Sequence, residues 1–299
     1  MRAIALLGPN AGAEDVAEFA AAARIAIASH STIDLESPPD VALIFGGDGT
    51  VHRHLKELVE TAVPALVVPT GSGNDFARAL ELNTRSRAVA AWRRFCEIRD
   101  NIRVIDVGEI VPGAQSPKPS VLFCCVAGAG IDADVNRRAN ALPRWLRANG
   151  AYALSVVGGA LGFRPQRITV EFEDEKGVTD GISEPALMCA FANANAYGHG
   201  MRIAPRAQLD DGLLELIFVR RASVARLLTV FPKVYFGSHI GLPEIEYRRV
   251  RRLRISSETP LDIYADGDFT CKTPADVAIR PKALKVISDF RRPHPSEPG

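Results

Sequence analysis

The first third of the chain alternates short apolar runs with amphipathic segments. Apolar runs of strand length occupy residues 2–7, 41–45 and 65–69. After the second run, apolar residues recur across 51–59 at the spacing of one helical face, and a similar segment follows the third run at 74–80. Repeated strand–loop–helix units predict a parallel sheet with right-handed crossovers, so we expect an α/β domain here.

The pattern changes at a polar, proline-rich segment, residues 113–120. Beyond it, short apolar runs separated by turn signals predict strands at 121–126, 167–174, 186–191, 213–219, 251–256, 261–265 and 276–280. One helical segment, at 143–163, interrupts them. Such a series predicts an antiparallel β-sandwich. We therefore expect an α/β domain at 1–116, which the C-terminal segment 283–299 could complete, and a β-sandwich domain at 120–282.

Composition narrows the function classes. The 299 residues carry a net charge of +1, so no overall field favours nucleic acid as a partner. The start of the chain does not resemble a secretory signal, and the longest apolar stretch, 153–163, is shorter than the ~20 residues that span a bilayer. Five cysteines, an odd number without a C-x-x-C pair, indicate free thiols and a cytoplasmic protein.

Two glycine loops carry the candidate chemistry. Gly46-Gly47-Asp48-Gly49-Thr50 follows the strand at 41–45, and Gly71-Ser72-Gly73 follows the strand at 65–69. Glycine allows the backbone to approach a phosphate closely, and a following helix adds N–H groups and a positive dipole end. Because ligands of open α/β sheets bind at the carboxyl ends of the strands, the two loops together could cradle one triphosphate.

The sequence does not contain the other common phosphate-binding motifs. The chain contains no G-x-x-x-x-G-K-[ST], no G-x-G-x-x-G, and neither the HRD nor the DFG triplet of protein kinases.

Asp48 is unexpected in a phosphate loop because its charge would repel the ligand. A divalent cation could lie between them, or Asp48 could order the loop by accepting its N–H groups. A tight turn without ligand is the remaining alternative.

At this point the residues resemble the catalytic domain of diacylglycerol kinases, including the bacterial lipid kinases and the related sphingosine and ceramide kinases. The resemblance rests on GGDGT at 46–50 and PTGSGNDFARAL at 69–80, where Ser72 replaces a threonine of the family. It continues in NANAYGHGMRIAPRAQLDDGLLEL at 193–216 and ends with Asp266-Gly267-Asp268, which matches a D-G-E motif. The resemblance covers nearly the whole chain.

The resemblance implies an ATP-dependent lipid kinase that phosphorylates a diacylglycerol-type hydroxyl. It implies that ATP binds through Gly46, Gly47, Asp48, Gly49, Thr50, Val51, His52, Gly71, Ser72, Gly73, Asn74 and Asp75. Read from the residues alone, the side chains of Asn74 and Asp75 are helix caps. The family also holds a structural Mg²⁺, which implies the Asp211 carboxylate and the backbone of Gln208 and Leu213. Asp48 and Asp268 are the implied catalytic residues.

Asp268 stands where the family has a glutamate, the general base that accepts the proton of the lipid hydroxyl. The aspartate is one methylene shorter, so it falls more than about 1 Å short of the reach of a glutamate unless the hairpin shifts. Both Asp-Gly pairs, at 211–212 and 266–267, are also ordinary turns. Two alternatives therefore stay open: a NAD kinase-like enzyme, which shares GGDGT, and a lipid- or nucleotide-binding module without catalysis.

A kinase of lipids needs contact with a membrane surface. Arg137, Arg138, Arg144, Trp145 and Arg147 precede the apolar segment 148–163 and could rest on an anionic bilayer; a core helix is the alternative. The basic strand at 248–254 could face phosphate head groups or be a solvated sheet face. We expect peripheral membrane association, and the sequence leaves the oligomeric state open, with a homodimer as one possibility.

Overall fold

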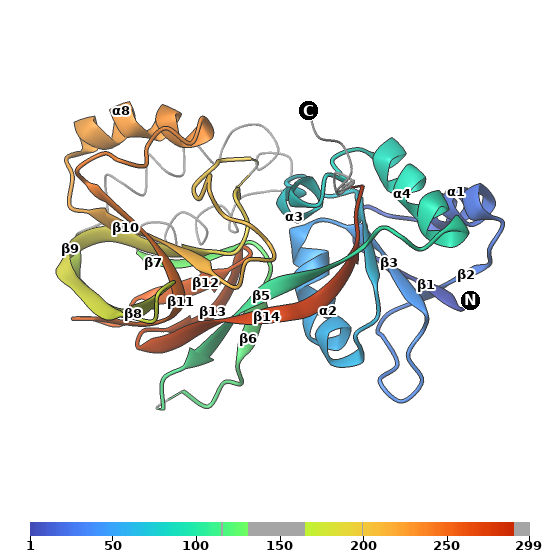
Figure 1. The fold of residues 1–299 in the computed structure, drawn as a ribbon, viewed down its shortest axis with the longest axis horizontal. Coiled ribbons are helices and arrows are strands. Elements are labelled where there is room, and N and C mark those ends of the chain that lie inside the picture. Colours follow the sequence, from blue (N-terminus) through green and yellow to red (C-terminus); the bar gives the residue numbers. More distant parts are fainter. Residues whose placement is uncertain (115, 131–164, 199, 290–299) are drawn as a thin grey trace. The chain divides into compact units, whose positions relative to one another are not determined.

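The computed structural model describes residues 1–114, 116–130, 165–198 and 200–289 (Figure 1). It divides the chain into two compact units. The first comprises Met1–Val104 together with the chain from Leu284 onward, and the second comprises Ile105–Ala283. The helix expected at 143–163 and the basic residues before it lie outside the described residues.

The first unit contains a parallel sheet. Its strands are β1 (Ala3–Leu7), β2 (Ile27–His30), β3 (Val41–Gly46) and β4 (Ala65–Pro69), in the order β2-β1-β3-β4. The end of β14 (Ala275–Ile287) adds a fifth parallel strand, because Val286 pairs with Ala65. Val41–Phe45 are fully buried, as expected for a parallel strand covered on both faces. The predicted α/β domain is confirmed.

In the described residues of this unit, the helices are α1 (Ala13–Ala23), α2 (Asp48–Thr61), α3 (Asp75–Ala79) and α4 (Arg85–Glu97). Phe19 of α1 meets Phe45 of β3 edge to face, with ring centroids 5.1 Å apart. The indole N–H of Trp92, in α4, donates to the backbone oxygen of Phe19 at 2.9 Å. Arg85 at the start of α4 forms ion pairs with Asp15 and Glu18 of α1, which fixes the two helices together.

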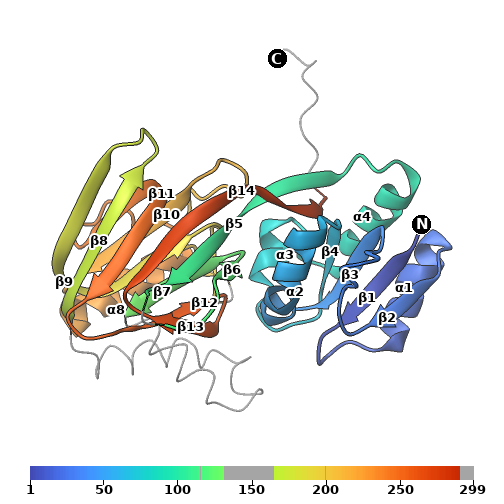
Figure 2. The ribbon, with the colours of Figure 1, turned by 90° about the horizontal axis from the view of Figure 1, so that it is seen from below.

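The second unit is built from antiparallel strands (Figure 2). They are β5 (Ile102–Pro112), β6 (Val121–Phe123), β7 (Val126–Gly130), β8 (Gln166–Asp174), β9 (Thr179–Ala192), β10 (Leu214–Arg220), β11 (Ile245–Ser257), β12 (Asp262–Ala265), β13 (Asp268–Lys272) and β14, with one described helix, α8 (Val224–Tyr235). The main order is β13-β12-β7-β9-β10-β11-β14.

Two long strands bend the second unit into a closed, sandwich-like arrangement. β9 pairs with β8 along its first part and with β10 along its second part. β11 pairs with β10 first and with β8 afterwards. Strands that switch partners in this way turn the corner between two sheet layers. A fully apolar core fills the interior, with Phe123, Phe191 and Phe218 among its fully buried members.

The chain passes between the two units inside strands rather than through a loop. The passages lie at Val104/Ile105, within β5, and at Ala283/Leu284, within β14. The proline-rich segment at 113–120, expected to separate the domains, is instead the connection between β5 and β6, which pair antiparallel. Its polar composition suits a hairpin loop as well as it suits a linker.

Candidate active site

The two glycine loops meet at one edge of the parallel sheet. β3 and β4 are direct neighbours, and Gly46 is in register with Pro69, so both loops begin at the same level. A Cβ added at Gly71 would lie 2.6 Å from the Cα of Gly47, and a Cβ at Gly47 would lie 3.0 Å from the Cα of Gly71. A Cβ atom does not tolerate the contact at Gly71, and the contact at Gly47 would force a small shift, so the loops pack backbone against backbone because glycine occupies these positions.

Asp48 ties the two loops together. Its carboxylate accepts the backbone N–H of Asp75 at 3.1 Å and that of Phe76 at 2.9 Å, at the start of α3. A Cβ on Gly73 would lie 3.0 Å from the same carboxylate, so the second loop wraps closely around it. Of the two explanations for an acid in a phosphate loop, the structure shows the ordering of N–H groups. Asp48 acts as an N-terminal cap for a helix outside its own segment.

Asn74 closes the second loop on itself. Its side chain accepts the N–H of Gly71 at 2.9 Å and donates to the Gly71 carbonyl oxygen at 2.6 Å. Its backbone lies in the left-handed region, with φ of 55°, and its side chain makes no cap hydrogen bond to α3. Asp75 is buried and forms an ion pair with Arg78. Asn74 is thus the residue before the first turn of α3, as predicted, but the N–H groups of Asp75 and Phe76 are capped by the Asp48 carboxylate and not by the Asn74 side chain.

The remaining predicted nucleotide residues differ in what they can offer a ligand. Thr50 and Val51 turn their side chains inward and are 5% and 2% exposed. His52 is half-buried and Ser72 is exposed. Apart from its chain neighbours and the backbone of its own helix, no described atom lies within 4 Å of the place where a Cβ of Gly49 would be, so the start of α2 is open to close approach. Backbone N–H groups are thus the main donors of this loop.

A third loop belongs to the same edge and is missing from the predicted site. Gly8, directly after β1, donates its N–H to the carbonyl oxygen of Phe45 at 2.8 Å, and a Cβ there would lie 2.6 Å from the Thr50 hydroxyl. The Asn10 side chain donates to the Thr70 carbonyl oxygen at 3.4 Å. A glycine and a proline directly after a buried strand were the available signal.

The predicted metal turn lies in the second unit, just before β10. Gly212 has φ of 74°, and the Asp211 carboxylate accepts the N–H of Leu213 at 3.1 Å. Asp106, only 1% exposed, supports this turn from β5, since its carboxylate accepts the N–H groups of Gly212 and Lys282, each at 2.7 Å. No local motif marks Asp106 in the sequence, because all its partners are distant along the chain.

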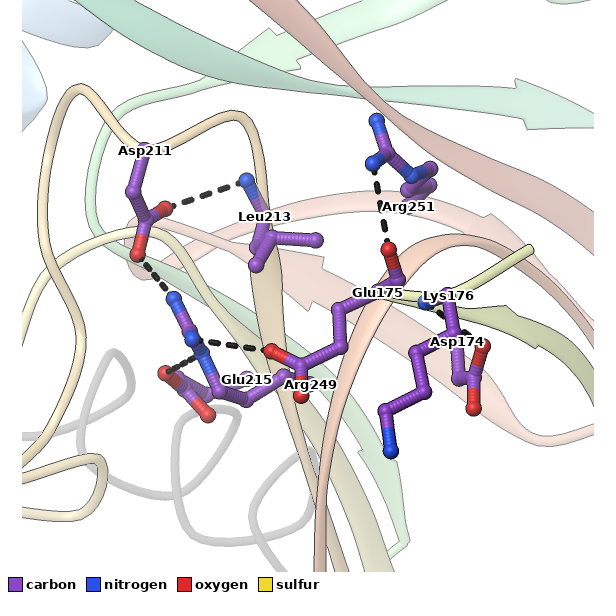
Figure 3. A network of polar contacts seen from close by, with 8 residues as sticks. All are labelled: Asp174, Glu175, Lys176, Asp211, Leu213, Glu215, Arg249 and Arg251. Carbon is purple, nitrogen blue, oxygen red and sulfur yellow. Dashed lines mark hydrogen bonds and ion pairs between the residues drawn. The ribbon is translucent and has the colours of Figure 1, made fainter. Parts of the chain in front are cut away.

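Arg249 of β11 is the side-chain partner of Asp211 in this structure (Figure 3). The same guanidinium contacts Glu175 at 2.9 Å and Glu215 at 3.5 Å. Glu215 is 2% exposed, and one of its oxygens has no hydrogen-bond partner. Burial raises the pKa of the Glu215 carboxyl to about 7, although Arg249 pulls it down.

The donors expected for Mg²⁺ fit a hard cation, since a carboxylate and two backbone carbonyls supply only oxygen. With Arg249 in place, however, the positive charge at Asp211 is already supplied. Among the described residues, no group of three or more histidine, cysteine, aspartate or glutamate side chains is arranged to hold a metal. A cation here would depend on Asp211 and the carbonyl oxygens of Gln208 and Leu213.

Each arginine of the basic strand at 248–254 has an acidic or backbone partner. Ion pairs or hydrogen bonds join Arg248 to Glu246, Arg249 to Asp211, Glu175 and Glu215, Arg251 to the Glu175 carbonyl oxygen, Arg252 to Glu173, and Arg254 to Asp276. This pairing favours the solvated, charge-matched sheet face over a surface for phosphate head groups.

The hairpin that carries Asp268 is held by its neighbour Asp266. Asp266 and Gly267 have φ of 50° and 93°, which form a two-residue hairpin turn between β12 and β13. The Asp266 carboxylate accepts the N–H groups of Cys124 and Cys125 at 2.8 Å and that of Val126 at 3.2 Å. Asp268, the first residue of β13, is exposed. Asp266 thus anchors the hairpin, and Asp268 is open to solvent.

Asn193 joins the metal turn to this hairpin within the second unit. Its fully buried side-chain amide donates to the carbonyl oxygens of Asp106, at 3.0 Å, and Cys124, at 2.9 Å. Asp106 holds the Asp211 turn, and the segment at Cys124 holds the hairpin through Asp266. A continuous set of hydrogen bonds therefore connects the two predicted chemical groups of this unit. Asn193 opens the third stretch of the family resemblance, but its position in that stretch did not reveal its role.

Two family models match the chain, and together they cover most of it. The diacylglycerol kinase catalytic domain matches residues 5–110. The YegS C-terminal NAD kinase beta sandwich-like domain matches residues 125–288. Two solved structures share the fold over 96% of this chain. The first is a diacylglycerol kinase from Bacillus anthracis, with a TM-score of 0.66, 16% sequence identity and 97% of its own length covered. The second is an NAD kinase from Archaeoglobus fulgidus in complex with ATP, with a TM-score of 0.53, 14% sequence identity and 92% of its own length covered.

Sequence relatives extend the likeness beyond the fold. A diacylglycerol kinase of Mycobacterium tuberculosis is 32% identical over 249 residues, which cover 83% of this chain and 76% of the relative. A protein of Chromohalobacter salexigens, named as a probable YegS-like lipid kinase, is 31% identical over 80% of this chain and 73% of its own. Because both halves of the chain match and the relatives span most of its length, the chain belongs to the diacylglycerol kinase family, a family of kinases.

Proposed function

We propose that the protein is an ATP-dependent lipid kinase that transfers the γ-phosphate of ATP to the hydroxyl of a diacylglycerol-type lipid. The observation that carries the proposal is the backbone contact between Gly47 and Gly71, which Asp48 secures by capping α3. It gives one edge of the sheet two adjoining loops that can be approached closely, as a triphosphate requires. The relatives named diacylglycerol kinase and lipid kinase favour a lipid as the acceptor.

In this proposal, the residues of the two units have separate tasks. The N–H groups at the start of α2 and in the 71–73 loop bind the phosphates. Asp268 accepts the proton of the lipid hydroxyl, whose oxygen bonds to the γ-phosphorus as the bond to the leaving ADP oxygen breaks. Mg²⁺, held by Asp211 and the carbonyl oxygens of Gln208 and Leu213, would add positive charge to the turn that Asp106 supports.

The test is a phosphorylation screen with the purified protein. Incubation with Mg²⁺, γ-labelled ATP and a total lipid extract is expected to label a lipid fraction, and mass spectrometry of that fraction identifies the acceptor. Parallel reactions contain NAD in place of lipid. Labelling of NAD alone would support the NAD kinase-like alternative. ATP binding without any labelled product would instead support a binding module that lacks catalysis.

We propose that the protein is cytoplasmic and reaches its lipid by peripheral contact. In the described parts of the chain, no helix is long and apolar enough to cross a bilayer. Helix α8 ends in an aromatic group that fits an interface: Phe231 packs edge to face on Tyr235, and Phe236 is 79% exposed. Lys233 is exposed in the last turn of the helix. Aromatic rings beside a cation suit the boundary between lipid head groups and acyl chains.

Replacing Phe236 by serine is expected to weaken binding to vesicles of anionic and zwitterionic lipid by about tenfold, since one buried aromatic side chain contributes that order of affinity. Vesicle sedimentation measures the bound fraction. Val178→Ser is the matched control, because Val178 is 55% exposed on the β8–β9 turn. Equal loss in both variants, or no loss in either, would remove α8 from the contact.

A homodimer also stays a prediction, which light scattering of the purified protein decides.

A further inference from the structure

Arg249 lies where three carboxylates converge. Its three guanidinium nitrogens are divided among them: one contacts Asp211, the second contacts Glu175 at 2.9 Å, and the third lies 3.5 Å from Glu215 (Figure 3). Arg249 is therefore shared between the metal turn and two acids that take no part in the expected metal set. It has other partners available if it leaves Asp211.

The register of the sheet fixes this arrangement. Arg249 pairs directly across from Glu215 in the antiparallel β10–β11 ladder. Asp211 belongs to the turn immediately before β10, and Glu175 belongs to the turn between β8 and β9. Since one guanidinium already contacts all three carboxylates, a change of the Arg249 rotamer would redistribute its charge among them.

Glu215 offers Arg249 a buried acceptor. It is 2% exposed, and its Oε2 atom has no hydrogen-bond partner, so a buried acceptor stands unused beside Arg249. A buried carboxylate oxygen without a donor is unfavourable. A guanidinium released from Asp211 could satisfy this oxygen, which gives the displaced state a compensation that an isolated ion pair would lack.

We propose that Arg249 and a divalent cation compete for Asp211. The guanidinium neutralises Asp211 when no cation is bound, and a bound cation shifts it onto Glu215 and Glu175. The reason is that a hard cation needs its oxygen ligands at about 2.0–2.6 Å, where a guanidinium on the same carboxylate would repel it. The inference rests on the proposed function only for placing the cation at the turn of Gln208, Asp211 and Leu213.

The competition predicts a gain of cation affinity when Arg249 is removed. Arg249→Gln is expected to bind Mn²⁺ or Mg²⁺ about tenfold more tightly than the unmodified protein, since one ion pair of this kind opposes binding by that order. Calorimetry and the electron paramagnetic resonance of free Mn²⁺ measure the affinity without nucleotide or lipid. Arg251→Gln is the matched control, because Arg251 lies on the same strand and donates to the backbone oxygen of Glu175 instead of pairing with Asp211.

Further variants separate the outcomes. Asp211→Asn should abolish the gain when combined with Arg249→Gln, which assigns the bound ion to this turn. If Arg249→Gln does not fold, Arg249→Lys takes its place, because it keeps the positive charge. Its cation affinity should lie between those of the unmodified protein and of Arg249→Gln. Unchanged or weaker cation binding in every folded Arg249 variant overturns the proposal. Because no measurement uses ATP or lipid, that failure is distinct from a failure of the proposed kinase activity.

Discussion

Replacing Asp268 by asparagine is expected to lower the turnover of lipid phosphorylation by about 10²–10⁴-fold, with ATP affinity unchanged. Asparagine keeps the shape of the side chain but cannot accept the proton of the attacking hydroxyl. The fold should tolerate the change, since Asp268 is exposed and the hairpin is held by Asp266 through three backbone N–H groups. Steady-state kinetics with the acceptor lipid, and calorimetry with ATP, measure the two quantities separately.

Asp268→Glu gives the opposite expectation. Glutamate reaches one methylene further, to the length that the family motif has at this position, so turnover should equal or exceed that of the unmodified protein. Asp262→Asn, on the neighbouring strand β12, is the control, because Asp262 forms an ion pair with Lys272. An Asp268→Asn enzyme with full turnover would remove this residue from the role of general base.

The glycine loops could be predicted because their signals are local. Each consists of an apolar run, a glycine cluster and a helical spacing within about 20 residues, which periodicity and composition can detect. The direct contact between Gly47 and Gly71 also follows from the parallel order of their strands. What the sequence could not decide was the role of Asp48, because its partners at Asp75 and Phe76 lie 27 and 28 residues away.

The second unit shows the opposite case. Asp106, Asn193 and Asp266 connect the metal turn to the hairpin, yet the hydrogen bond from Asn193 to Asp106 spans 87 residues and that from Cys124 to Asp266 spans 142. No short stretch of sequence contains both partners of either hydrogen bond. Strand β5, which carries Asp106, has no regular alternation because its first residues belong to one unit and the rest to the other.

The hydrophobic pattern did not predict helices α4 and α8, and the strength of the helix signal in the sequence differs between the two. Helix α4 buries Ala88, Ala91, Trp92 and Phe95, which follow one helical face, and Thr84 caps it. That signal was available but was diluted by the arginines on the exposed face. Helix α8 contains Pro232, which normally ends a helix, so its continuation to Tyr235 depends on tertiary context.

Two alanine substitutions in the phosphate loops should separate stability from nucleotide binding. Gly71→Ala is expected to lower the free energy of unfolding by about 1–3 kcal/mol, because the new methyl meets the backbone of Gly47. ATP affinity should fall with it, since the loops can no longer lie together. Urea denaturation and calorimetry with ATP measure the two effects.

Gly49→Ala is the matched counterpart, because its methyl would enter open space at the start of α2. Alanine restricts the unfolded chain and favours the helix, so the free energy of unfolding should rise by about 0.5–1 kcal/mol. ATP affinity should nevertheless fall, because the methyl would stand where a phosphate approaches the backbone. If Gly49→Ala binds ATP as tightly as the unmodified protein, the phosphates do not lie against this turn. Loss of affinity in a more stable protein can come only from the ligand side of the loop, which makes this variant the more informative of the two.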